Sequence, residues 1–156
     1  MMELLFTRRN RRAARGGDAR RLKQVVRMTL EMENMTERTV SILLTDDREI
    51  HEINLEWRHK DKPTDVLAFA YDEASDADII IPGQMMPLGD LIISVETAKR
   101  QADSRKVSLN AELELLAVHG SLHLLGYDHA AKEEARIMRN RTRVIRNALK
   151  KHLKDS

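Results

Sequence analysis

The sequence of 156 residues contains no cysteine, which excludes disulfide bonds and thiolate metal ligands and is typical of a protein in a reducing cytoplasm. No apolar run approaches the length of a membrane span. The first residues, MMELLF, are too short for a signal peptide, and arginines follow rather than precede them. No internal repeat is visible. We therefore expect a cytoplasmic protein without a membrane partner, in which residues 1–156 form a single domain.

The order of strand-like and helix-like segments predicts an α+β fold. Short apolar and β-branched runs predict strands at 3–7, 39–44, 66–71 and 88–95, and residues 79–81 form either a brief strand or a hydrophobic plug. Apolar residues at helical spacing predict helices at about 19–34, 47–59, 96–104, 109–125 and 131–150. We expect a small mixed sheet of about four strands packed with about five helices. One helix, at 109–125, is predicted to be central and buried.

Three polar residues are predicted to begin helices, because an Asp or Ser side chain can accept a hydrogen bond from a backbone N–H of the first turn. They are Asp18, Asp46 and Ser108. The helix after Asp46 has an apolar stripe that is expected to end at Trp57. The helix after Ser108 is apolar nearly all round, which predicts burial on all sides.

The central helix ends in HGSLHLLGYDH, residues 119–129. His119 and His123 are four residues apart, so both imidazoles lie on one face of a helix. Gly126 can take the left-handed conformation that ends a helix, after which the chain returns His129 towards the first pair. Three neutral imidazoles with one open coordination position are typical of a catalytic zinc site, although nickel and other divalent ions also accept imidazole. These three histidines are therefore the candidate metal ligands.

The same offsets occur in metalloproteases of the HExxHxxGxxH type. Those enzymes carry a glutamate after the first histidine, where it acts as the general base. Here that position is Gly120. The segment therefore keeps the metal geometry and lacks the protease base, which argues against peptide hydrolysis by their mechanism.

Positive charge is concentrated near the two ends of the chain, although the formal net charge is only +2. An arginine-rich loop at about 8–17 and a basic helix at about 131–152 could form a surface that attracts phosphate. The alternative is a loose loop and a solvated helix face. Within the loop, the candidate RNA contacts are Arg8, Arg9, Arg11 and Arg12.

Three segments resemble the YbeY family, bacterial metal-dependent endoribonucleases that mature ribosomal RNA. HGSLHLLGYDH is similar to the family signature, and LEWRHKDKPTDVLAFAY at 55–71 resembles its Arg-x-x-Asp-x-Pro-Thr-Asp-Val-Leu-Ser-Phe segment. LGDLIISVETAKRQA at 88–102 resembles its Gly-Asp-Ile-x-Ile-Ser strand and the helix that follows. The resemblance extends from about Val40 to the end of the last helix. Ala68 stands where serine is usual, and Trp57 stands where tyrosine is common.

The resemblance implies a zinc-dependent endoribonuclease that is specific for single-stranded RNA. It implies action in ribosomal RNA maturation, at the 3′ end of 16S rRNA, and in ribosome quality control, with the ribosome or small-subunit proteins as partners. The family pattern has arginine at position 58. We therefore expect Arg58 to reach a cleft beside the metal and, with the metal ligand His119, to act in catalysis. Lys60 and Lys62 are further candidate RNA contacts.

The sequence leaves the general base open. Metal-activated water could react unaided, or the carboxylate of Asp65 or Asp128 could accept the proton. Two other classes of protein also stay open. One is a metal-dependent peptidase or amide hydrolase, and the other is a non-catalytic RNA- or ribosome-binding factor with a structural metal.

Overall fold

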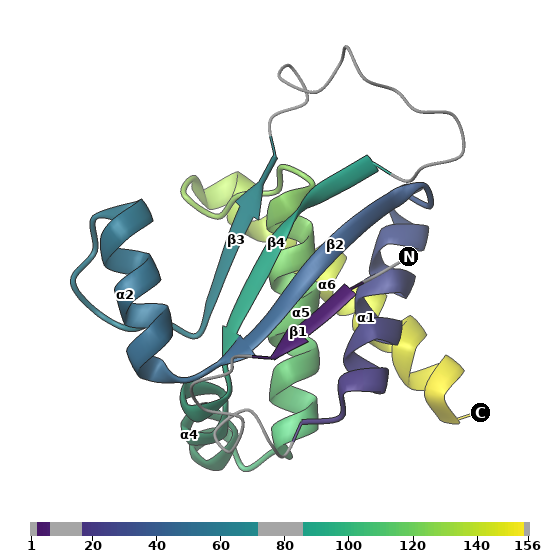
Figure 1. The fold of residues 1–156 in the computed structure, drawn as a ribbon. Helices are drawn as coiled ribbons and strands as arrows, with labels where there is room; N and C mark the ends of the chain where they lie inside the picture. Colours follow the sequence, from purple (N-terminus) through teal and green to yellow (C-terminus); the bar gives the residue numbers. More distant parts are fainter. Residues whose placement is uncertain (1–2, 7–16, 72–85, 155–156) are drawn as a thin grey trace.

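The computed structural model describes residues 3–6, 17–71 and 86–154. In chain order, the described elements are β1 (Glu3–Phe6), α1 (Ala19–Met32), β2 (Arg38–Thr45), α2 (Asp47–Arg58), β3 (Val66–Ala70), β4 (Met86–Ser94), α4 (Val95–Arg105), α5 (Leu109–Leu124) and α6 (Lys132–Lys154). The strands form one sheet in the order β1-β2-β4-β3 (Figure 1). β2 is parallel to β1 and β4, whereas β3 is antiparallel to β4. The predicted α+β fold with a mixed sheet is confirmed, and residues 79–81 lie outside the described residues.

The main core lies between one face of the sheet and helices α1, α4, α5 and α6. Leu44, Leu91 and Ile93 point into this core from alternate strand positions and are 0% exposed. On the opposite face, Ile92 packs against Ile50 of α2, and Figure 1 shows α2 beside the β3 edge of the sheet. Apolar side chains of β2 and β4 thus point to both faces of the sheet, and helices cover both faces.

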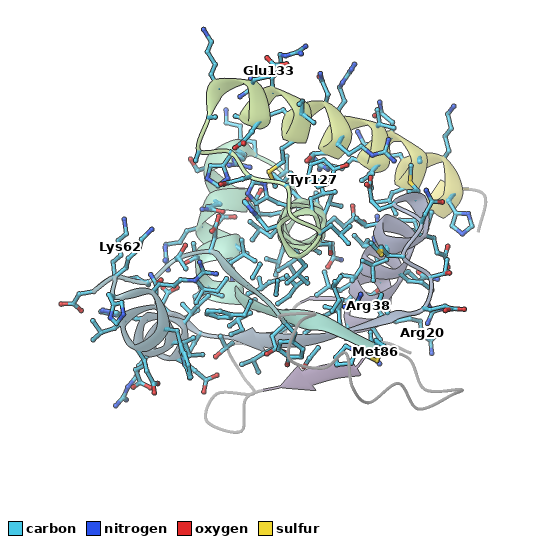
Figure 2. All side chains as sticks on the ribbon, turned by 90° about the horizontal axis from the view of Figure 1, so that it is seen from above. Arg20, Arg38, Lys62, Met86, Tyr127 and Glu133 are labelled. Atoms are coloured by element: carbon cyan, nitrogen blue, oxygen red, sulfur yellow. The ribbon has the colours of Figure 1, made fainter. Side chains whose placement is uncertain are left out.

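Helix α5 occupies the centre of the molecule. Figure 2, which looks along α5 from above, shows it between the sheet and α6, and α5 also contacts α1, α4, β3 and β4. Its leucine and valine side chains are buried in several directions, as the sequence predicts for a helix without a polar face. One acid, Glu112, is 1% exposed, and its carboxylate lies 3.3 Å from Nη1 of Arg105. None of the helices in the described ranges is both long and apolar enough to cross a membrane.

The predicted helix starts are confirmed, and the predicted end of one apolar stripe is wrong. Asp18, Asp46 and Ser108 each accept a hydrogen bond from the backbone N–H three residues later, at 3.1, 2.9 and 3.1 Å. Trp57 does not join the apolar stripe of α2, because it is 66% exposed. The helix packs on the sheet through Ile50 and Ile53 of its earlier turns, whereas the Trp57 side chain in its last turn is exposed to solvent.

Asp47 connects the start of α2 to the start of α4. Its carboxylate accepts hydrogen bonds from the hydroxyls of Ser94, at 2.6 Å, and Thr97, at 2.5 Å, and pairs with Arg100 at 2.8 Å. Burial acts to raise the pKa of Asp47, but these hydrogen bonds and the positive charge of Arg100 outweigh it and lower the pKa. The charged carboxylate therefore stabilises the junction of the two helices.

Candidate metal centre

Two of the three candidate ligands stand on α5, and the third lies on the turn that follows it. The turn begins at Gly126, whose φ of 97° is left-handed, as the sequence predicts. The N–H of Gly126 donates to the carbonyl of His123 at 3.0 Å, and the N–H of Tyr127 donates to the carbonyl of Leu122 at 3.1 Å. This pair of bonds is the Schellman arrangement that ends many helices. It reverses the chain and returns His129 towards α5.

The structure brings the three imidazoles together. Nε2 of His123 lies 3.2 Å from Nε2 of His119 and 3.2 Å from Nδ1 of His129. The three donor atoms all lie within 4.8 Å of one another. In a tetrahedral site with bonds of about 2.0–2.1 Å, neighbouring ligand atoms are about 3.3 Å apart. Two of the separations therefore already suit one divalent ion.

The surroundings of His119 and His123 favour neutral imidazoles, the form that binds metal. Burial lowers the pKa of His119, the charges of His123 and His129 lower it further, and Asp65 acts in the opposite direction. Burial also lowers the pKa of His123, and the charges of His129 and Arg58 lower it further, whereas the backbone hydrogen bond to Tyr127 and the charge of Asp128 act in the opposite direction. The ring of His123 hydrogen-bonds to the backbone of Tyr127. Since its Nε2 faces the other histidines, the ring is held with that atom towards the candidate metal position.

The cluster opens into a cleft of about 840 Å³. One wall consists of α5 and the turn after it, and the other consists of β3 and the connection between α2 and β3. The three histidines line this cleft together with Arg58, Lys60 and Lys62. The structure therefore places the three basic residues of the α2–β3 region in the same cleft as the candidate ligands.

Arg58 is held by its surroundings. Nη2 donates to the carbonyl of Ala68 at 2.6 Å, and the guanidinium carbon lies 4.9 Å from the centre of the Phe69 ring. The chain leaves α2 through His59 in a left-handed conformation, with φ of 58°. Nδ2 of Asn54 then donates to the carbonyl of Lys62 at 2.8 Å and fixes the connection. The guanidinium keeps further donors for a ligand, because it carries five N–H groups.

Both candidate carboxylates line the same cleft. Oδ1 of Asp65 accepts hydrogen bonds from the backbone N–H of Val66, at 2.8 Å, and from the hydroxyl of Thr64, at 3.3 Å. Oδ1 of Asp128 accepts a bond from the backbone N–H of His129 at 2.7 Å. Asp65 is half-buried, whereas Asp128 is exposed. Both are within electrostatic range of the cluster, so the geometry keeps both as possible proton acceptors.

The structure gives a physical reason for glycine at position 120. Gly120 lies where α5 crosses the sheet, and a Cβ atom built on it would be 2.7 Å from Cδ2 of Leu91 and 3.2 Å from Cγ2 of Val66. A glutamate side chain would require the buried side chain of Leu91 to shift. The close packing of α5 on β3 and β4 therefore disfavours a protease-type base at this position.

One set of contacts around the turn was not predicted from the sequence. The hydroxyl of Tyr127 donates to Oε2 of Glu33 at 2.9 Å, and Arg141 of α6 pairs with the same carboxylate. Figure 2 shows Tyr127 between α5 and α6. The carboxylate of Glu33, directly after α1, thus contacts both the turn that carries His129 and the last helix. No local spacing indicates this, because the partners lie about a hundred residues apart in sequence.

The arginines of the predicted N-terminal RNA contact, Arg8, Arg9, Arg11 and Arg12, lie outside the described residues.

A family model described as Endoribonuclease YbeY matches residues 8–150. Endoribonuclease YbeY of Bacillus cereus strain G9842 is 44% identical over 130 residues, which cover 81% of this chain and 83% of that protein. Endoribonuclease YbeY of Bacillus subtilis strain 168 is 44% identical over 116 residues, covering 72% and 74%. The solution structure of TM1509 from Thermotoga maritima is similar in fold, with a TM-score of 0.57 and 22% identity over 100% of this chain and 96% of that one.

Proposed function

The chain belongs to the endoribonuclease YbeY family, and on that basis we propose that it cleaves single-stranded RNA with a divalent metal held by His119, His123 and His129. The observation that carries the proposal is the convergence of three imidazole nitrogens, two pairs of them 3.2 Å apart, in a cleft lined by cations. Zinc is the proposed metal, because three neutral imidazoles and an open position are typical of its catalytic sites. Nickel is the alternative ion.

A divalent ion supplies Lewis acidity when bound, since it polarises a phosphoryl oxygen and makes a water molecule more acidic. Hydrolysis joins the water oxygen to phosphorus, breaks the bond to the leaving sugar oxygen, and transfers one water proton to that oxygen. Negative charge grows on the non-bridging oxygens as the new bond forms. Arg58 is suited to stabilise this charge, because Ala68 and Phe69 fix its guanidinium while it keeps unused donors. Lys60 and Lys62 would attract the phosphates on either side.

The proton acceptor is proposed to be Asp65 or Asp128, unless the activated water reacts unaided. Asp65 has the better-defined position, because two hydrogen bonds orient its Oδ1. The pH dependence of the cleavage rate for Asp65→Asn and Asp128→Asn separates the cases. Loss of the acidic limb of the profile in one variant identifies the base. A wild-type profile in both variants indicates that neither carboxylate takes the proton.

We place the action of the protein in ribosomal RNA maturation, at the 3′ end of 16S rRNA, and in ribosome quality control in the cytoplasm, with the ribosome or small-subunit proteins as partners. Support comes from the family alone. A peptidase is disfavoured by the packing at Gly120, and a casein assay tests it. A purely structural metal is disfavoured because structural zinc sites are closed by four ligands, whereas this cluster lines an open cleft.

The direct test combines metal analysis with RNA cleavage. Purified wild-type protein should contain stoichiometric divalent metal and should cleave unstructured RNA, whereas His119→Ala should lose both metal and activity while keeping its fold by circular dichroism. The proposal is wrong if metal-loaded protein, free of contaminating nuclease, leaves both structured and unstructured RNA intact. Unfolding of His119→Ala, with no activity in the wild type, would instead favour a structural metal.

A further inference from the structure

A second groove meets the metal cluster from the side of α6. It has a volume of about 450 Å³ and is formed by α5 and α6. His119 and His129 line both this groove and the larger cleft that contains Arg58. The two depressions therefore join at the candidate ligands, so that a chain-like ligand could run from one into the other past the metal.

The groove beside α6 has a basic rim. Four basic residues of α6, at positions i, i+4, i+7 and i+11, lie on one face of the helix and line the groove: Arg139, Arg143, Arg146 and Lys150. No acidic residue lines it. None of the four forms an ion pair with another residue of the described part of the chain. By contrast, two other arginines of α6 form ion pairs: Arg136 pairs with Glu133, and Arg141 pairs with Glu33, which follows α1. The four groove-facing charges are thus available to a ligand.

The floor of the groove is apolar. Leu115 of α5 and Met138 of α6 line it together with Thr142. The hydroxyl of Thr142 donates to the carbonyl of Met138 at 2.8 Å, so the side chain has already satisfied its donor within the helix. An apolar floor beneath a row of cations suits a ligand with flat apolar faces and a string of negative charges, which describes single-stranded nucleic acid.

We propose that this groove binds the RNA strand on one side of the scissile phosphodiester, while the cleft of Arg58, Lys60 and Lys62 binds the strand on the other side. The inference rests on the proposed endoribonuclease function and adds a second RNA site to it. An enzyme that cuts within a strand must hold that strand on both sides of the cut. From Arg139 to Lys150 the rim extends about 16 Å at 1.5 Å per residue, enough for more than one phosphate contact.

The test uses two double variants that remove equal charge from the same helix. Arg143→Gln/Lys150→Gln removes two groove-facing cations, and Arg136→Gln/Lys151→Gln removes two exposed cations that do not line the groove. Binding of a labelled oligouridine is measured by fluorescence anisotropy over a range of salt concentrations. The groove variant should raise Kd by about 2- to 25-fold, since each of the two exposed charge contacts contributes a factor of about 1.4 to 5. Its log Kd should depend less on log salt, by about 1.4, for two lost single-strand contacts.

The control variant should change Kd and the salt slope little, and thermal unfolding verifies that both variants fold. Cleavage is then measured on RNAs extended on the 5′ or the 3′ side of one cut. The groove variant should lose the affinity gained from one extension, and Lys60→Gln/Lys62→Gln should lose that from the other. Equal behaviour of groove and control variants, with wild-type cleavage intact, overturns the groove and leaves the nuclease standing. A wild-type protein that neither binds nor cuts RNA overturns both.

Discussion

Replacing Gly126 by alanine should destabilise the protein and leave its fold unchanged. The φ of 97° at this position is left-handed, and a Cβ atom built on Gly126 meets no heavy atom within 4 Å. Crowding therefore contributes nothing, and the whole effect comes from the backbone conformation. For a residue with a side chain, the left-handed region costs about 1–2 kcal/mol.

That cost can appear in two measurable quantities. In a chain of 156 residues, each 1 kcal/mol lowers Tm by roughly 2–4 °C, so the expected decrease is roughly 2–8 °C. The chain can avoid the strain only by opening the turn. Opening the turn would break the hydrogen bonds of 3.0 and 3.1 Å that end α5. It would also move His129 away from the other two imidazoles. The same free energy would then appear as a loss of metal affinity of about 5- to 30-fold.

The assay is thermal unfolding with a chelator present, together with metal titration of the same variant. Gly126→Asn is the matched control, because asparagine enters the left-handed region more readily than alanine. It should recover most of the lost stability and affinity. If Gly126→Ala keeps both the wild-type Tm and the wild-type affinity, or if the asparagine variant is damaged equally, the left-handed turn does not fix His129.

Three further predictions concern protonation and long-range contacts. Burial lowers the pKa of His119 and His123 below 6.5, so the unfolded chain binds more protons and the metal-free protein should lose stability as pH falls below about 6.5. The free energy of unfolding is measured by urea titration at several pH values, and an equal dependence on pH in the wild type and in His119→Gln/His123→Gln would contradict this. Tyr127→Phe removes the hydroxyl bonded to Glu33 and should lower the free energy of unfolding by about 1 kcal/mol, with weaker metal binding through His129; unchanged affinity would refute the positioning role. Hydrogen bonds that outweigh burial lower the pKa of Asp47 below 3.8, so its contribution is present above that pH, and Asp47→Asn should be less stable at neutral pH by about 1 kcal/mol, a difference that vanishes on acidification; a constant difference would exclude the charged carboxylate as its source.

Local patterns predicted the parts of this structure that depend on neighbouring residues. The caps at Asp18, Asp46 and Ser108 follow from one side chain and the backbone three residues on. The burial of α5 follows from its lack of a polar face. The convergence of His119 and His123 follows from helical periodicity, and Gly126 indicated the turn that returns the third histidine. The candidate metal cluster was therefore accessible from the sequence, because all of it lies within one helix and one turn.

Contacts between distant segments could not be predicted in the same way. The exposure of Trp57 depends on where α2 stops covering the sheet, which periodicity does not specify. The tie from Glu33 to Tyr127 and Arg141 joins three elements whose order in space is set by the sheet topology.

The basic last helix shows the same limit in a form that matters for function. Its sequence indicates many positive charges and an apolar stripe, but not which of the charges beside that stripe lie next to the histidines, because that depends on how α6 packs against α5. Packing of Met138, Ile145 and Leu149 into the core sets the rotation of α6. That rotation directs Arg143 and Lys150 towards the groove at the histidines and leaves the other exposed cations to the solvent. The apolar stripe of α6 therefore decides which of its charges can meet a substrate, and a change in that stripe should redirect them even if every arginine and lysine is kept.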